Sequence, residues 1–411
     1  KSINMKYLFI TVLIIASFCS CRKSQIETFD NTGLENGTIS LIANHNLLIA
    51  DGVAELQLIP QVYEKLAFKV DRIMDPSGKD PNFGKDSTFN VLYLNDRFKD
   101  GDVKYFFEDG TEMDEPFFRT TATLPATRTF YAEILGKRTN DFTVSIIPPI
   151  IQQFEEVTFP VVFHLVTTRI LDSYGFGLPT ENIDRLINGL NSAFGRIGIT
   201  SPNGADAKIK FRMAEYDING NRMATPGIHK VFLPDAGYAS IGSNVNGVPE
   251  MLWDAKKYLN IWVMKAGIDA TLPAHALPDF NVPGITVTTV DESFNPNTLD
   301  PAAKGFVISE AALAKNDLDY GMMFGRFFGL LETRNTVNDY CDDTFSWVSK
   351  DFNNGKWKIN SDGMRYLSVN IMDESSSKTT LSKEQVLRVR AVLENCPARW
   401  AYKSDWAFTG H

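Results

Sequence analysis

Acidic side chains gather near the end of the chain, at Asp339, Asp342, Asp343, Asp373 and Glu374. Carboxylates and backbone carbonyls together can bind Ca²⁺, but the ligand spacing of a calcium-binding loop is missing here. Asp373 and Glu374 could in principle act as an acid and base pair on a glycosidic bond. Adjacent residues rarely project to opposite sides of one bond, so this chemistry is disfavoured. We therefore expect the acidic cluster to be a solvated rim.

Histidine, the usual ligand of catalytic zinc, is scarce in this sequence and widely spaced. His164 falls within a continuous apolar run, and His411 is the last residue. His45 lies in the other domain, at 37–150, which leaves His229 and His275 as the two that could reach a site in the C-terminal domain. The chain also lacks the G-x-S-x-G elbow of serine hydrolases and a phosphate-binding P-loop.

The composition of the 411 residues excludes several classes of protein. Hydrophobic residues make up 44% and charged residues 22%, which is typical of folded chains and excludes wholesale disorder. The net charge of −9 offers no basic excess, so we expect no nucleic-acid partner. This length favours two domains, or at most three.

The N-terminus has the pattern of an export signal. Lys6 precedes an apolar run at residues 8–18, which is too short to span a bilayer and suits a signal-peptide core. Ser20 provides the small residue needed for cleavage before Cys21. The pattern resembles a bacterial lipobox, which implies a signal peptide at 1–20, a lipid on Cys21 and a polar tether at 21–36. The alternative is a plain secretory signal.

Two cysteines remain in the mature chain, Cys341 and Cys396. Cysteine pairs in exported proteins usually form disulfides. We therefore predict a Cys341–Cys396 disulfide, with two buried thiols as the alternative.

Residues 37–150 have the alternating pattern of short strands. Residues 54–58 alternate apolar and polar side chains, as do 129–134 and 142–146, with a turn at 136–140 between the last two. This stretch resembles a bacterial immunoglobulin-like module. Pro148 and Pro149 then end the pattern and mark the domain boundary.

Residues 151–411 alternate predicted strands with predicted helices, which indicates an α/β or α+β domain. Apolar runs predict strands, and apolar residues at helical spacing predict helices. The expected strands are 160–166, 207–213, 258–264 and 284–290, and the expected helices are 180–197, 249–257, 318–328 and 382–394.

Several of these segments, in this order, resemble pappalysin-type metzincins, a family of zinc metalloproteases. They include the opening strand, the long helix after it, and the strand at 258–264. The stretch 338–344 resembles a segment that follows the active-site helix in this family, 369–373 resembles the Met-turn with Met372, and 384–399 resembles the family's C-terminal part. The resemblance covers roughly residues 159–399.

The metzincin motif H-E-x-x-H-x-x-G-x-x-H places two zinc ligands one helical turn apart and a third beyond a glycine turn. In this chain Gly329 is kept. The four functional positions hold, in order, Met322, Met323, Arg326 and Glu332. After the Met-turn, Glu374 replaces the family's tyrosine. The resemblance therefore implies a kept scaffold without its zinc ligands, general base or phenol.

A guanidinium at a former ligand position would repel a metal cation. We therefore expect no zinc and no other cofactor, and we predict that Arg326 and Glu332 point toward each other as an ion pair. The alternative is that both side chains point to solvent. Met322 and Met323 are expected to pack in the core.

The sequence thus predicts an immunoglobulin-like β-sandwich at 37–150 and a metzincin-like domain at 151–411 with a mixed, mostly parallel sheet. We expect a monomeric lipoprotein of the bacterial outer membrane or cell surface that has no peptidase activity and binds a peptide or protein in the former active-site cleft. Two alternatives remain. One is an active endopeptidase with an unusual metal site that borrows His229, His275 or an acidic residue. The other is a structural surface protein or adhesin.

Overall fold

The computed structural model describes most of the chain that follows the N-terminal segment. It describes residues 37–68, 88–93, 98–169, 180–234, 249–264, 282–284, 305–309, 313, 320–334, 338–347, 357–360, 365–373 and 379–411. The predicted signal peptide, Cys21 and the tether lie outside these residues, as do the strand expected at 285–290, His275 and Glu374. Within the described residues, no helix has both the length and the apolar character needed to cross a membrane.

The chain divides into two compact units that do not follow the predicted boundary at residue 150. One unit comprises Lys1–Leu41, Pro60–Lys104 and Ala132–Asn140, and the other comprises Ile42–Ile59, Tyr105–Tyr131 and Asp141–His411. The domain limits derived from the sequence stay a prediction.

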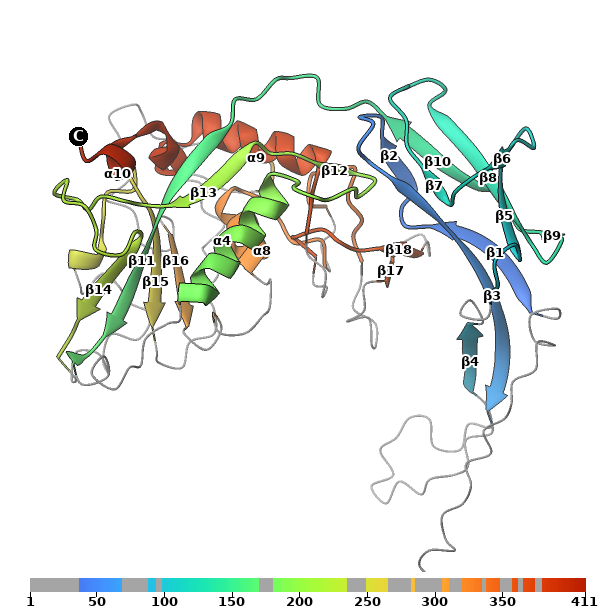
Figure 1. Cartoon of the computed structure of the whole chain (residues 1–411), viewed down its shortest axis with the longest axis horizontal. Coiled ribbons are helices and arrows are strands. Elements are labelled where there is room, and N and C mark those ends of the chain that lie inside the picture. The colour runs from blue at the N-terminus through green and yellow to red at the C-terminus, as the bar shows by residue number, and fades with distance from the viewer. Residues whose placement is uncertain are drawn as a thin grey trace, which may run out of the picture. The chain divides into compact units, whose positions relative to one another are not determined.

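The described residues between 37 and 147 form strands and connecting turns, in two sheets. One sheet has the order β1-β3-β4 with β7 beside β3, and the other has the order β2-β10-β8-β5-β6 with β9 beside β8 (Figure 1). Their bounds are β1 Thr38–Ala43, β2 Leu47–Ile49, β3 Leu56–Phe68, β4 Thr88–Tyr93, β5 Val103–Phe107, β6 Glu112–Met113, β7 Phe117–Phe118, β8 Thr127–Ile134, β9 Lys137–Arg138 and β10 Phe142–Ile147.

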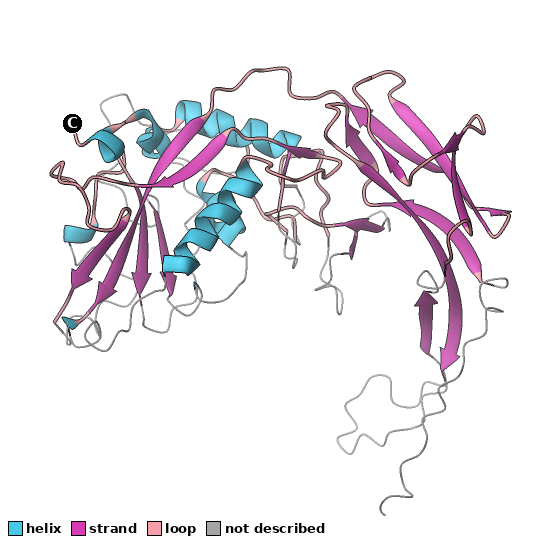
Figure 2. Ribbon diagram, viewed as in Figure 1, coloured by secondary structure: helices cyan, strands magenta, loops and turns pink. Residues whose placement is uncertain are grey.

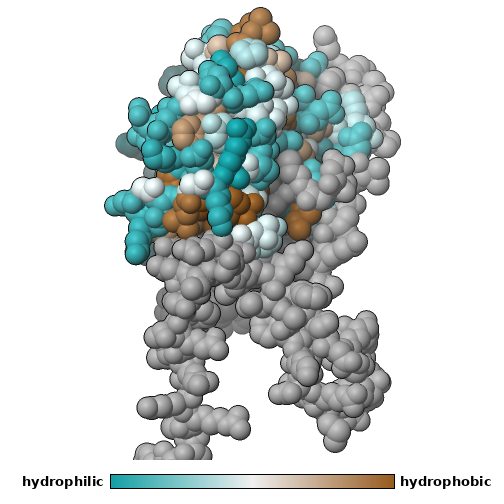
Figure 3. Space-filling model, turned by 90° about the vertical axis from the view of Figure 1, so that its right-hand side faces the viewer, coloured by the Kyte–Doolittle hydropathy of each residue, from teal (hydrophilic) through white to brown (hydrophobic). Residues whose placement is uncertain are grey.

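Alternating side chains from these strands form apolar cores, as predicted. In the first unit Val62 and Ile134 are buried together. In the second, the Phe118 ring lies 5.2 Å from that of Phe130 and 5.9 Å from that of Phe107. Figure 3 shows a surface that is largely hydrophilic where it is coloured, with small separate hydrophobic groups.

The rest of the second unit is mixed α/β (Figure 2). A parallel sheet has the order β13-β11-β15-β16, with β14 paired to the far end of β11. The strands are β11 Val157–Thr167, β12 Gly204–Ala205, β13 Ile209–Met213, β14 Ile228–Phe232, β15 Leu259–Met264, β16 Gly305–Ser309, β17 Trp357–Ile359, β18 Arg365–Leu367 and β19 Leu381–Ser382. The helices are α4 Thr180–Phe194, η3 Pro249–Met251, α8 Tyr320–Phe327, α9 Lys383–Asn395, η5 Pro397–Lys403 and α10 Trp406–Thr409.

Two of the expected helices are shorter than the sequence predicted. The helix expected at 249–257 is only the single turn η3. Helix α4 ends at Phe194, because Arg196 adopts a left-handed conformation with φ of 50°. Ile197, which was expected on the apolar face of this helix, therefore lies beyond it and is 60% exposed.

Buried aromatic rings show which face of the parallel sheet the helices cover. Phe306 stacks on Phe324 of α8 with ring centroids 4.4 Å apart, and Phe211 meets the same ring edge to face at 5.2 Å. Phe194 at the end of α4 meets Phe211 at 5.3 Å. Helices α4 and α8 therefore pack on the same face of the sheet (Figure 1).

Candidate functional site

Helix α8 carries the positions that correspond to the zinc motif, and its packing orients them. Met323, Phe324 and Phe327 are buried against the sheet. Residues four apart share a helix face, so Met322 and Arg326 lie together on the less buried side of α8. Met323 packs in the core, as expected from the sequence, whereas Met322 is only partly buried and the same expectation for it is wrong.

Gly329 ends the helix in a tight turn. It has a φ of 82°, a conformation that costs glycine little. The Gly329 N–H donates to the Arg326 carbonyl at 2.9 Å, and the Leu330 N–H donates to the Gly325 carbonyl at 2.9 Å. These two bonds form a Schellman motif, which reverses the chain and brings Glu332 back toward α8.

The predicted ion pair between Arg326 and Glu332 is confirmed, as Nη2 of Arg326 contacts Oε1 of Glu332. The Arg326 side chain is 12% exposed and that of Glu332 is 30% exposed, so the pair is largely shielded from solvent. Burial lowers the pKa of Arg326 from its ordinary value. The carboxylate compensates a positive charge that would otherwise be poorly solvated.

Met372 lies directly beneath α8. Its side chain is fully buried, and a Cβ atom added at Gly325 would collide with its sulfur. The Asn370 side chain accepts a hydrogen bond from the Met372 N–H at 2.8 Å and fixes the turn. Gly325 is therefore needed for the close approach of the helix to Met372.

The expectation of a solvated acidic rim is wrong for Asp339, Asp343 and Asp373, which are 7%, 3% and 2% exposed. Asp373 accepts hydrogen bonds from the Trp347 indole and the Ser368 hydroxyl, and burial raises its pKa. These carboxylates are internal hydrogen-bond acceptors. Of the other two, Asp342 is exposed and Glu374 lies outside the described residues.

Asp343 contacts the N-terminus of helix α9, where Ser382 is the N-cap residue. Its carboxylate accepts the Ser382 hydroxyl at 2.6 Å and the Glu384 N–H at 3.0 Å. Burial raises the pKa of Asp343 to about 6, although these two hydrogen bonds act in the opposite direction. The spacing of the carboxylates in the sequence predicted a solvated environment for Asp343, but this carboxylate is buried, and burial favours its neutral form.

The buried base Lys358 completes the surroundings of Asp373, and the sequence gave no reason to select it. Its side chain is fully buried, its ammonium lies 3.6 Å from the centre of the Trp347 ring, and its charge lowers the pKa of Asp373. Lysine is rarely buried unless paired. The pattern Trp-Lys-Ile at 357–359 predicts an ordinary exposed strand lysine, so only tertiary packing could reveal it.

His229 does not lie near α8. Its Nδ1 is 2.9 Å from Nδ1 of His164, whose Nε2 is 2.8 Å from the Asn260 side-chain oxygen. The strand registers pair His164 with His229, and Phe163 with Ile261. Because successive strand residues face opposite sides, these histidines occupy the face away from α8. The expectation that His229 could reach a site at α8 is therefore wrong.

The predicted disulfide is also wrong. Cys341 and Cys396 are both buried thiols that are not joined to each other. Cys396 packs with Val282 and Val392. Cys341 lies beside the carboxylates of Asp339 and Asp343, and burial first, then these charges, raise its thiol pKa. The number of cysteines in a sequence cannot reveal whether two of them are joined.

The residues at the motif positions do not fit a zinc ion. Arg326 supplies a permanent positive charge, and its partner Glu332 is already neutralised by it. Met322 offers a thioether, a soft ligand that pairs poorly with a carboxylate around Zn²⁺. Across the described ranges, no three His, Cys, Asp or Glu side chains gather closely enough to hold a metal ion.

No family model matches the chain, and no curated protein matches it. Several solved structures resemble part of it, among them three of mirolysin. Promirolysin of Tannerella forsythia has 19% sequence identity and a TM-score of 0.43, and the match covers 62% of this chain and 86% of that one. Mature mirolysin in complex with a cleaved peptide has 20% identity and a TM-score of 0.42, covering 62% and 98%.

Mirolysin in complex with compound 9 gives 20% identity and a TM-score of 0.44, covering 63% of this chain and 100% of that chain. Mirolysin is a metalloprotease. Similarity at this level does not define an activity for the present chain, whose function has to be argued from its own residues.

Proposed function

We propose that this protein is an exported lipoprotein whose metzincin-like domain has lost zinc catalysis and binds a peptide or protein without cleaving it. The Arg326–Glu332 ion pair carries this proposal. The pair joins α8 to the segment beyond the Gly329 turn. In the related motif, zinc joins these same two parts of the chain. The close contact of Gly325 with Met372 supports a scaffold that is kept although its ligands are replaced.

An extended peptide is the ligand that such a domain could bind without a metal. A peptide that adds to a strand edge is held by its backbone N–H and C=O groups, which need no catalytic residue. We propose that the ligand occupies the former active-site cleft. We further propose that a lipid on Cys21 anchors a monomeric protein to the outer membrane or cell surface.

Metal analysis of the purified protein tests the loss of zinc. After incubation with equimolar zinc and gel filtration, we expect much less than one zinc per chain and no chelator-sensitive hydrolysis of casein. Near-stoichiometric zinc with chelator-sensitive hydrolysis would defeat the proposal and favour the active endopeptidase.

A variant with the full motif restored provides the matched control. Met322→His, Met323→Glu, Arg326→His and Glu332→His together should bind about one zinc per chain if the scaffold is kept. Failure of a folded restored variant to bind zinc would mean that these positions do not converge on one point.

Peptide binding is tested with a mixed-sequence nonapeptide library labelled with a fluorophore, and with the same library N-methylated at alternate residues. We expect measurable binding for the first library and at least tenfold weaker binding for the second, because N-methylation removes the backbone donors. Equal binding of the two libraries would contradict the strand-addition mode.

A further inference from the structure

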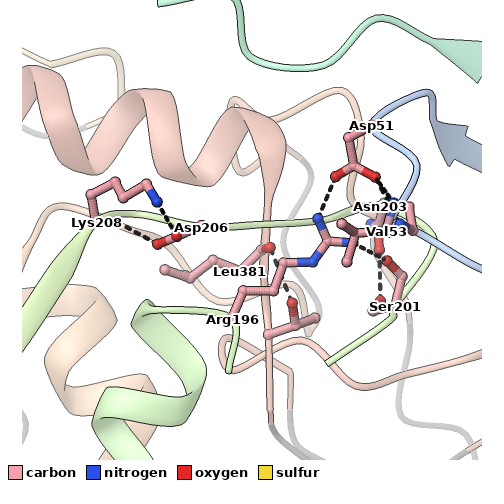
Figure 4. A network of polar contacts seen from close by, with 10 residues as sticks. Asp51, Val53, Arg196, Ser201, Asn203, Asp206, Lys208 and Leu381 are labelled. Carbon is pink, nitrogen blue, oxygen red and sulfur yellow. Dashed lines mark hydrogen bonds and ion pairs between the residues drawn. The ribbon is translucent and has the colours of Figure 1, made fainter. Parts of the chain in front are cut away.

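A cavity of about 370 Å³ lies at the C-terminal end of α4, and none of the residues that line it belongs to α8 or the Met-turn. Its volume is within the range of small-molecule sites. The lining includes Asp51, Arg196, Asp206 and Lys208, whose contacts are drawn in Figure 4. All of these residues belong to the second compact unit.

Arg196 lines this cavity and has one buried donor without an acceptor. Its side chain is 7% exposed, Nη1 donates to the Asp51 carboxylate, and Nη2 donates to the Ser201 carbonyl at 3.3 Å. The Nε atom is buried and has no hydrogen-bond acceptor among the residues that the structure describes. A buried N–H without an acceptor is costly, so an acceptor is expected to reach it.

The two carboxylates of the cavity are already occupied by hydrogen-bond donors. Asp51 accepts the N–H groups of Val53 and Ala54 at 2.8 and 2.7 Å in addition to Arg196. These bonds hold the pKa of Asp51 below its usual range, although burial alone would raise it.

The second carboxylate is satisfied in the same way. Asp206 accepts the Lys208 N–H at 2.7 Å, and its other oxygen lies 2.8 Å from the Lys208 ammonium. That ammonium has three donors and is 48% exposed, so it can serve a second acceptor. The polar part of the cavity therefore offers donors to a ligand.

The backbone holds both bases in an uncommon conformation. Arg196 and Lys208 have φ of 50° and 55°, and they are two of the four non-glycine residues with positive φ in the described part of the chain. Such left-handed residues carry a conformational cost and concentrate at binding and catalytic sites. Here the two residues with this conformational cost are the cations that line the cavity.

Apolar groups line the rest of the cavity. Ile49, Ile150 and Phe154 contribute to its wall, and Val53 lines it while remaining 51% exposed. We propose that this cavity binds a small organic molecule with an apolar body and a terminal carboxylate, which accepts hydrogen bonds from Arg196 Nε and the Lys208 ammonium. This site is independent of the function proposed for α8.

The probe for this proposal is 5-phenylpentanoate, and its neutral analogue 5-phenylpentanamide is the matched comparison. With the full chain in titration calorimetry or ligand-observed NMR, we expect saturable binding of the carboxylate and at least tenfold weaker binding of the amide. The absence of saturable binding, or equal affinity for both compounds, overturns the proposal.

Substitutions in the lining test whether 5-phenylpentanoate binds in this cavity. Val53→Asp adds a negative charge at a half-exposed position and should weaken carboxylate binding about tenfold, whereas Val53→Asn should change it less than twofold. Ile218→Asp adds the same charge at an exposed position outside the lining and should have no effect. Unchanged binding in Val53→Asp overturns the assignment. Arg196→Lys removes the Nε donor and should reduce the preference for the carboxylate, and the two Val53 variants decide the matter even if this variant does not fold.

Discussion

Arg326 and Glu332 form an ion pair across the glycine turn that ends α8. One residue belongs to the helix and the other to the chain that returns beside it, so the pair fixes the exit of the helix. Removing the charge of one residue leaves the other charge shielded from solvent and without a partner. Replacing both residues with apolar ones leaves no charge behind.

Arg326→Ala should therefore lower the free energy of unfolding by about 2 kcal/mol, below the value for a fully buried pair because Glu332 is partly exposed. The double variant Arg326→Met with Glu332→Leu should lose less than the single variant. Thermal and urea unfolding of the three proteins measure this. If both variants unfold like wild type, the pair contributes nothing to stability.

Gly325→Ala should be destabilising although alanine is normally the better helix former. The added methyl group would collide with the Met372 sulfur, and such overpacking costs about 1–3 kcal/mol. In a Met372→Ala background the same change should be neutral or stabilising, because helix propensity then dominates. A double-mutant cycle by urea unfolding measures the coupling, and additive effects would show that the two residues do not contact.

Asp343 should make the protein less stable as pH rises through the mildly acidic range. Its pKa is raised from 3.8 to about 6 mainly by burial, so between these values the folded state binds more protons than the unfolded state. The free energy of unfolding should then fall by about 2 kcal/mol from pH 4 to pH 6 through this residue. In Asp343→Asn this contribution should be absent, which urea unfolding across that range measures. An unchanged pH slope in the variant would show that Asp343 does not titrate in this window.

His45 should act in the opposite direction. Its ring is buried, stacks on Phe345 at 4.7 Å and accepts the Leu47 N–H at 3.0 Å. Burial lowers its pKa from 6.5 to about 4, so this residue favours folding above pH 6.5, and its contribution is lost as pH falls toward 4.

The loss through His45 should approach about 3 kcal/mol at pH 4. His45→Asn keeps an acceptor near the Leu47 N–H but does not titrate, so its stability should fall less between pH 6.5 and 4. The exposed His411→Asn serves as the control and should follow wild type. Equal acid sensitivity in His45→Asn and wild type would contradict the prediction.

Local patterns in the sequence were sufficient to predict most of the described regular elements. The apolar run in β11, the apolar face of α4, and the helix α9 expected at 382–394 each depend on residues that are neighbours in the chain. The ion pair was also predictable, because the motif spacing put Arg326 and Glu332 on the two sides of one glycine turn.

The environments of single side chains depended on the tertiary structure. No spacing pattern predicts that Asp343 and Asp373 are buried. Ser382 donates to Asp343 and Trp347 donates to Asp373 from distant parts of the chain. The absence of a bond between Cys341 and Cys396 was likewise visible only in the tertiary structure.

The sequence by itself determined where strands and helices form and which ligand types stand at the motif positions, because these properties are local. Only the tertiary structure decided that His229 faces away from α8, that Lys358 is buried, and that Arg196 and Lys208 line one cavity. The reason is that sheet register and long-range packing bring together residues that are far apart in the chain, and no spacing within one segment encodes those distances.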